Sequence, residues 1–166
     1  MKTWFVSGSS RGLGLAITEA ALAGGHRVVA TARDLRPLDP LREQFGDTLR
    51  LARLDVTDED AAQAAIDLAV SAFGGVDVVV NNAGYGELGS VEDTSLESFR
   101  RQIEVNLIGT IIVSKAVIPV LRRQRRATSY KSRRSVEGSV PPRGPPIRLR
   151  NGVSKVFPSR WRARWN

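Results

Sequence analysis

Residues 3–14 read Thr-Trp-Phe-Val-Ser-Gly-Ser-Ser-Arg-Gly-Leu-Gly: a short apolar run, a glycine-rich turn and the start of a helix. Its glycines Gly8, Gly12 and Gly14 follow the spacing Gly-x-x-x-Gly-x-Gly. In such a pattern the first glycine permits the turn, the second lets the backbone approach a ligand, and the third lets helix and strand pack closely. The first N–H groups of a helix lack internal partners and lie at its positive end, so the pattern favours a pyrophosphate site. Taken alone, the spacing also fits an ordinary surface turn.

Composition limits the possible functions. A chain of 166 residues suits one domain with a core of its own. The absence of cysteine and the single histidine, His26, argue against disulfides, metal sites and Ser-His-Asp triads. The N-terminus does not resemble a signal peptide, and we expect no apolar run long enough to span a bilayer. The sequence therefore predicts a cytoplasmic protein that binds no metal and no membrane.

Charge divides the chain near Arg122. The formal net charge is +8, yet residues 1–121 hold 11 Lys or Arg against 16 Asp or Glu. Residues 122–166 hold 14 Lys or Arg, one acid and five of the eight prolines. We expect a folded domain over residues 1–125 and a basic Arg/Pro/Ser-rich tail over residues 126–166, which this composition predicts to be disordered.

Strand and helix patterns alternate four times in the first part of the chain. Such alternation with short links predicts an α/β fold, a doubly wound parallel sheet with helices on both faces and right-handed crossovers. Ligands of these folds bind at the carboxyl ends of the strands, where the glycine turn lies. The expected strands are 3–6, 27–32, 49–54 and 76–80, and the expected helices are 13–22, 40–45, 58–73 and 95 or 96 to about 121.

Four motifs, in order, resemble those of the short-chain dehydrogenase/reductase family over about residues 1–121. They are Gly8-x-x-x-Gly12-x-Gly14, Asp55-Val56-Thr57, Asn81-Asn82-Ala83-Gly84 and Asn106-Leu107-x-Gly109. The resemblance implies a Rossmann-like NAD(P)-binding domain and an oxidoreductase that acts on a small-molecule alcohol or carbonyl compound. The resemblance implies homo-oligomers formed through the long helix and a later one, and since we expect the later helix to be absent here, an oligomer is doubtful.

The resemblance also implies a role for each motif. The glycine turn holds the cofactor pyrophosphate, Asp55 accepts a hydrogen bond from the adenine amino group, and residues 81–84 pass the adenosine ribose and brace the sheet. Asn106, on the catalytic side, kinks its helix and holds a water in the proton relay. The alternatives are a helix N-cap for Asp55 and a buried, satisfied amide for Asn106. The implied cofactor-binding residues are Gly8, Ser10, Arg11, Gly12, Leu13, Gly14, Arg33, Asp55, Val56, Asn82, Ala83 and Gly84.

The charges after the second strand bear on the choice of cofactor. A carboxylate there would bind the ribose hydroxyls of NAD and repel a 2′-phosphate. Arg33 occupies this place, Asp34 follows it, and Arg11 adds a second cation in the glycine turn. Because two guanidinium groups can fork onto a phosphate, these residues favour NADP over NAD. The alternative is that Arg33 is merely solvated.

The Ser and the Tyr-x-x-x-Lys pair that the family uses for chemistry are missing. The two tyrosines do not fit, because Tyr85 lies in the Asn-Ala-Gly loop and Tyr130 is followed four residues later by Arg134. No fifth strand is recognisable after the long helix. We therefore expect the fold to stop after the fourth strand and that helix, leaving residues 76–80 as an open apolar edge, and the chain to be inactive.

A shifted reading frame after about residue 125 is one explanation. If each true codon takes the last base of one residue's codon and the first two bases of the next, residues 126–135 can encode Gly-His-Ile-Ile-Gln-Ile-Ser-Ser-Val. The Pro146–Ile147 and Arg150–Asn151 junctions can then encode a Tyr and a Lys four apart. These strings resemble the family's fifth strand, catalytic serine and Tyr-x-x-x-Lys motif, which leads to the hypothesis of one lost base near Arg126.

Two functions stay open on the sequence. One is an NADP-dependent oxidoreductase of unknown small-molecule substrate, present in an inactive form. The other is a non-catalytic nucleotide-binding protein whose basic tail contacts nucleic acid or another anionic surface. The tail has few aromatic residues, among them Trp161 and Trp165, and no recognisable fold, so we favour the first and expect no nucleic-acid partner.

Overall fold

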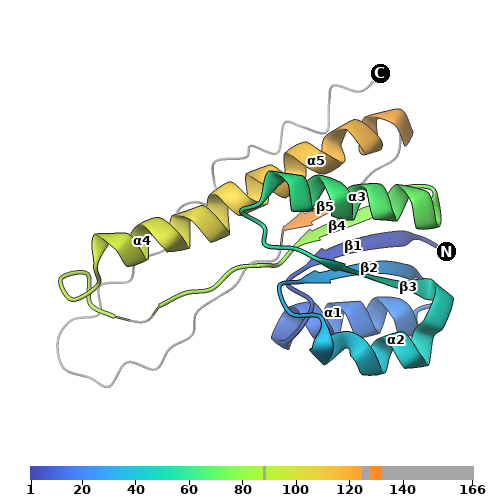
Figure 1. Ribbon diagram of the computed structural model, residues 1–166, viewed down its shortest axis with the longest axis horizontal. Coiled ribbons are helices and arrows are strands. Elements are labelled where there is room, and N and C mark those ends of the chain that lie inside the picture. Colours follow the sequence, from blue (N-terminus) through green and yellow to red (C-terminus); the bar gives the residue numbers. More distant parts are fainter. Residues whose placement is uncertain (88, 125–127, 132–166) are drawn as a thin grey trace. The chain divides into compact units, whose positions relative to one another are not determined.

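The computed structural model describes residues 1–87, 89–124 and 128–131, which Figure 1 draws in colour. All of them lie in one compact unit, Met1–Val136. Of the tail predicted over residues 126–166, only 128–131 are among the described residues.

Five parallel strands form one sheet in the order β3-β2-β1-β4-β5. At its centre, Phe5 of β1 is in register with Val29 of β2 on one side and Val79 of β4 on the other. The strand order reverses at β1, which confirms the predicted Rossmann-like, doubly wound topology. The strands are β1 (Thr3–Ser7), β2 (Arg27–Ala32), β3 (Leu49–Arg53), β4 (Val78–Asn81) and β5 (Thr128–Lys131).

The sheet extends one strand further than the sequence predicted. β5 pairs in parallel with β4, from Val78 opposite Thr128 to Asn81 opposite Lys131. The expectation that the fold stops after its fourth strand and leaves an open apolar edge is therefore wrong. Pairing uses main-chain N–H and C=O groups, so a polar segment without apolar periodicity can still cover an edge.

Helices cover both faces of the sheet (Figure 1): α1 (Gly12–Ala23) and α2 (Asp39–Phe45) on one, α3 (Glu59–Phe73) and α5 (Gly109–Gln124) on the other. Short 3-10 turns, Arg36–Leu38 and Gly46–Thr48, flank α2.

Successive strand residues point to opposite faces and so supply two cores. In β1, Phe5 joins the core beneath α3 and α5, whereas Val6 joins the core beneath α1 and α2. In β4, Val79 joins the first core and Val78 and Val80 join the second. Near-continuous apolar strands of this kind are typical of a parallel sheet buried on both faces.

The predicted long helix is continuous but not uniform. It comprises α4 (Leu96–Ile103), a π-helical segment (Glu104–Ile108) and α5. Pro119 lies inside α5, which continues to Gln124, three residues beyond the predicted end.

This helix, Leu96–Gln124, is long and apolar enough to cross a membrane as judged by length and composition. The expectation that no apolar run reaches that length is therefore wrong. Its buried residues Ile112, Val113 and Val117 belong to the core that α3 also supplies. Packing within the α/β fold thus accounts for part of its apolar character.

α5 begins against the loop that follows β3. A Cβ atom on Gly109 would lie 2.5 Å from Cγ2 and 3.2 Å from the carbonyl oxygen of Val56. The position therefore has no space for a side chain. This contact joins two motifs, Asn106-Leu107-x-Gly109 and Asp55-Val56-Thr57, that are far apart in the sequence.

We expect Gly109→Ala to lower the free energy of unfolding by about 1–3 kcal/mol, the usual cost of overpacking, although alanine favours helices. Urea denaturation followed by circular dichroism measures the change. Lys115→Ala, at an exposed position of the same helix, is the matched control and should change stability by less than about 0.5 kcal/mol. Equal stability of Gly109→Ala and wild type would contradict the packing described.

Candidate functional site

The glycine turn connects β1 to α1 at the carboxyl end of the central strand. Gly8 and Gly12 have φ angles of +69° and +57°, in the left-handed region that glycine adopts without strain. A Cβ atom on Gly14 would lie 2.1 Å from the Gly8 carbonyl oxygen and 2.4 Å from Nδ2 of Asn82. One on Gly8 would lie 2.8 Å from Cα of Ala83. The turn thus has no space for side chains at Gly8 and Gly14.

Open space remains on the other side of the turn. A Cβ atom on Gly12 would meet no atom within 4 Å. Arg11 is the N-cap of α1, and its side chain makes no capping hydrogen bond. Arg11 and Leu13 are exposed, and Ser10 is half-buried. The first N–H groups of α1 are therefore left for an anion, so the turn fits a diphosphate.

Ser7 ties the loop after β4 to the glycine turn. Its Oγ accepts hydrogen bonds from the amides of Asn82 at 3.0 Å and Ala83 at 3.1 Å. Nδ2 of Asn82 donates to the carbonyl oxygens of Ser7 at 3.1 Å and Gly8 at 3.0 Å. Residues 82–84 are thus held against the turn. Sequence reasoning missed Ser7, although a hydroxyl that ends an otherwise apolar strand was a visible signal.

Asn106 lies in the π-helical segment and holds the same loop from the other side. Its Oδ1 accepts from the Tyr85 amide at 2.9 Å, and its Nδ2 donates to the Tyr85 carbonyl oxygen at 2.7 Å. A Cβ atom on Gly84 would lie 2.6 Å from this Oδ1. The amide is therefore satisfied, as the alternative interpretation held, but the residue is exposed rather than buried.

Asp55 follows β3 and is held by Thr57. Its Oδ1 accepts from the Thr57 amide at 3.1 Å and the Thr57 hydroxyl at 2.8 Å. Partial burial by itself raises the pKa of Asp55, but these bonds and the positive charge of Arg33 outweigh it and hold the pKa below its usual value. The N-cap of α3 is Asp58, whose side chain accepts from the Ala61 amide at 2.9 Å. The alternative that Asp55 caps a helix is therefore wrong.

Cations gather where β2 and β3 end. Arg33 directly follows β2 and is exposed. Arg53 ends β3, is exposed, and is in register with Ala32, so it reaches the same edge of the sheet. Sequence reasoning missed Arg53, because only the pairing of the two strands brings it near Arg33. Asp34, the residue after Arg33, forms an ion pair with Arg36, in which Nη2 of Arg36 lies 2.7 Å from Oδ2 of Asp34.

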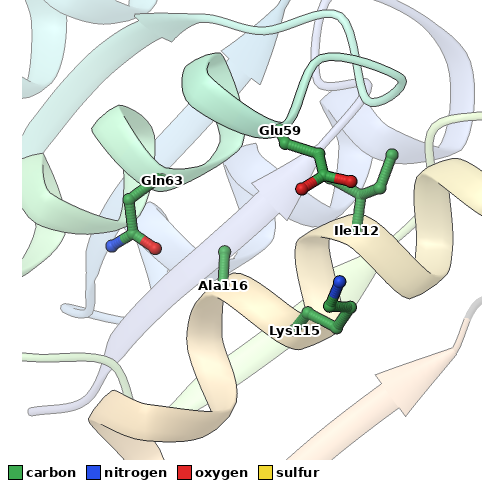
Figure 2. A pocket seen from close by; sticks show the side chains of 5 residues that line it. All are labelled: Glu59, Gln63, Ile112, Lys115 and Ala116. Atoms are coloured by element: carbon green, nitrogen blue, oxygen red, sulfur yellow. The ribbon is translucent and has the colours of Figure 1, made fainter.

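A pocket of about 200 Å³ lies elsewhere, between α3 and α5 (Figure 2). None of its lining residues is among those predicted for the cofactor. We place the site at the glycine turn instead, because the carboxyl ends of parallel strands bind ligands in this fold. The pocket is lined by Glu59, Gln63, Ile112, Lys115 and Ala116.

The sequence matches a known family, because residues 2–129 fit the family model described as short chain dehydrogenase. The chain belongs to the short chain dehydrogenase family. The resemblance drawn from the four motifs is thereby confirmed.

Relatives are similar to this chain over about three quarters of its length. Oxidoreductase BOA17 of Botryotinia fuckeliana is 49% identical over 125 residues, which are 75% of this chain and 46% of that protein. A short-chain dehydrogenase structure from Streptomyces avermitilis superposes with a TM-score of 0.74 at 34% identity, covering 79% of this chain and 49% of that one. The closed form of a serine dehydrogenase complexed with NADP+ superposes with a TM-score of 0.73 at 28% identity, covering 78% of this chain and 52% of that one. The chain thus spans about half the length of these relatives.

The lowered pKa of Asp55 predicts a pH-dependent contribution to stability. Ionised Asp55 stabilises the fold above its unfolded pKa of about 3.9, and this contribution is lost as the pH falls through the lower folded pKa. At pH 7 we expect Asp55→Asn to be less stable than wild type by about 1 kcal/mol, the worth of a hydrogen bond to a partly buried charged group.

Urea midpoints of both proteins between pH 7 and pH 2.5 measure this, and the difference should shrink below about pH 4. Glu92→Gln, at an exposed position, serves as the control. A difference that stays constant down to pH 2.5 would show that the pKa of Asp55 is not lowered.

Proposed function

We propose that this chain is the cofactor-binding part of an NAD(P)-dependent oxidoreductase that acts on a small-molecule alcohol or carbonyl compound. The observation that carries the proposal is the uncapped N-terminus of α1, open at Gly12 and braced by Asn82. Membership of the short chain dehydrogenase family supports it. Because the relatives are about twice as long, their activities, substrates and assembly are not transferred to this chain.

Different residues are proposed to bind different parts of the cofactor. Amides at the start of α1 hold the diphosphate, Oδ2 of Asp55 accepts from the adenine amino group, and residues 82–84 pass the ribose. Both hydrogen bonds that Thr57 donates to Asp55 end on Oδ1, which leaves Oδ2 for this donor. When bound, the nicotinamide ring donates or accepts a hydride. Asn106 fixes the backbone of the loop at Tyr85 and is the proposed member of the proton relay.

Charge supports NADP in preference to NAD. Arg11 and Arg33 are both exposed, and a guanidinium group binds a phosphate through two parallel hydrogen bonds. Arg53 adds a third cation at the edge where β2 and β3 end. One relative is a serine dehydrogenase complexed with NADP+. We therefore propose that these arginines bind the 2′-phosphate.

A Tyr-x-x-x-Lys motif is missing from the sequence. Its two tyrosines are Tyr85 and Tyr130, and neither is followed by a lysine four residues later. We propose that this 166-residue form is inactive in hydride transfer because the reading frame shifts near Arg126. The shifted-frame strings described above support this explanation.

Nucleotide sequencing across codons 115–166 tests the frame hypothesis. We expect one base to be missing near codon 126, and the restored frame to encode Ser and Tyr-x-x-x-Lys. A protein expressed from the restored frame should reduce carbonyl compounds with NADPH, whereas the 166-residue chain should not. An intact frame that reproduces the tail to Asn166 would refute the hypothesis.

NADPH and NADH titrations of the 166-residue chain, followed by nucleotide fluorescence, test the cofactor proposal. We expect tighter binding of NADPH, and a loss of about tenfold or more in its affinity on Arg33→Ala, the worth of one charged hydrogen bond. The NADH affinity should barely change, and Arg100→Ala, which removes an exposed arginine on α4, should affect neither. Equal losses for both nucleotides would contradict the role of Arg33.

A further inference from the structure

Arg36 forms an ion pair and several hydrogen bonds with the carboxylate of Asp34. Its Nε lies 3.0 Å from Oδ1 and 3.1 Å from Oδ2 of Asp34, and its Nη2 lies 2.7 Å from Oδ2. The backbone amide of Arg36 also donates to Oδ1, at 3.1 Å. Both carboxylate oxygens are thus occupied by one residue, two positions along the chain.

This pair lies directly after β2, at the edge of the sheet where we propose that the cofactor binds. β2 ends at Ala32, so Asp34 is the first acid after the strand, next to Arg33. Its side chain is 49% exposed. A free carboxylate at the end of this strand would accept hydrogen bonds from a ribose diol and repel a 2′-phosphate.

We propose that Arg36 determines cofactor selectivity by holding Asp34 away from the ribose, so that the charge around Arg33 stays suited to a 2′-phosphate. Arg36 is a positioning residue in this scheme, because it acts on the cofactor through Asp34. The inference rests on the proposed binding of NADP.

The remaining charges at this edge agree with such a role. Within the described part of the chain, no ion pair engages Arg33 or Arg53. Asp55 also lies within reach of the Arg33 charge, but it is held by Thr57, so Asp34 is the acid next to Arg33 whose charge an ion pair counters. The Asp34 carboxylate is ionised at neutral pH, and the hydrogen bonds from Arg36 lower its pKa further. Its charge is therefore balanced by a partner rather than removed by protonation.

Stability alone does not explain the pair. Exposed ion pairs contribute little to folding, and the Arg36 side chain of this one is 87% exposed. The bond from the Arg36 amide to Oδ1 of Asp34 already forms the turn. The guanidinium group adds three contacts that the turn does not need, and these fix where the charge of Asp34 points.

A mutant cycle on the 166-residue chain tests the inference, with the ratio of the NADH to the NADPH dissociation constant as readout. For Arg36→Leu we expect this ratio to fall about fivefold or more, the effect of one freed charge near a phosphate in a solvent-exposed site. Asp34→Asn alone should change it less than about twofold, since the wild-type charge is already countered. The double variant Asp34→Asn/Arg36→Leu should return to the ratio of Asp34→Asn.

Two results would overturn the inference. An unchanged ratio in Arg36→Leu would show that Asp34 does not reach the cofactor. A lowered ratio that persists in the double variant would show that Arg36 contacts the phosphate directly. Thermal unfolding separates a folding defect from a selectivity effect, and Arg36→Lys should recover part of the ratio. If wild type binds neither nucleotide, the proposed function itself fails, which these titrations show before any variant is compared.

Discussion

The contact between Gly14 and the Gly8 carbonyl oxygen is the constraint on which the site depends. A Cβ atom placed on Gly14 would lie only 2.1 Å from that oxygen, so any side chain would push α1 away from β1. The same atom would lie 2.4 Å from Nδ2 of Asn82, which holds the turn through the carbonyl oxygens of Ser7 and Gly8. One close approach thus fixes the start of the helix, the turn and the loop after β4 together.

The other motifs meet through contacts of the same kind. Gly109 sets α5 against Val56, and Gly84 faces the side-chain amide of Asn106. In each pair a glycine on one segment leaves room for a neighbour from a distant one. The π-helical segment places Asn106 where both its amide atoms bind the backbone of Tyr85. The proposed phosphate and adenine side of the site is therefore built within residues 7–109, although the relatives are about twice as long.

The sequence predicted the elements whose signals are local. Apolar runs and glycines at element ends predicted β2 at its observed bounds, Arg27–Ala32. They predicted α3 to within one residue of its observed bounds, Glu59–Phe73. Features that depend on pairing between distant segments were missed or left open. Thr128–Lys131 has no apolar pattern and becomes a strand by pairing with β4. Arg53 reaches the site edge only through its register with Ala32. The choice between two roles for Asp55 required the observation that Asp58 caps α3.

Backbone amide shifts recorded by ¹⁵N-labelled NMR during an NADPH titration of the 166-residue chain test the central claim most directly. The account predicts that the largest shifts fall on the amides of Gly12, Leu13 and Gly14, with smaller ones at residues 82–84. The pocket residues Glu59 and Lys115 should stay unchanged. Shifts confined to the pocket between α3 and α5, or no shifts in a folded chain at saturating nucleotide, would contradict it.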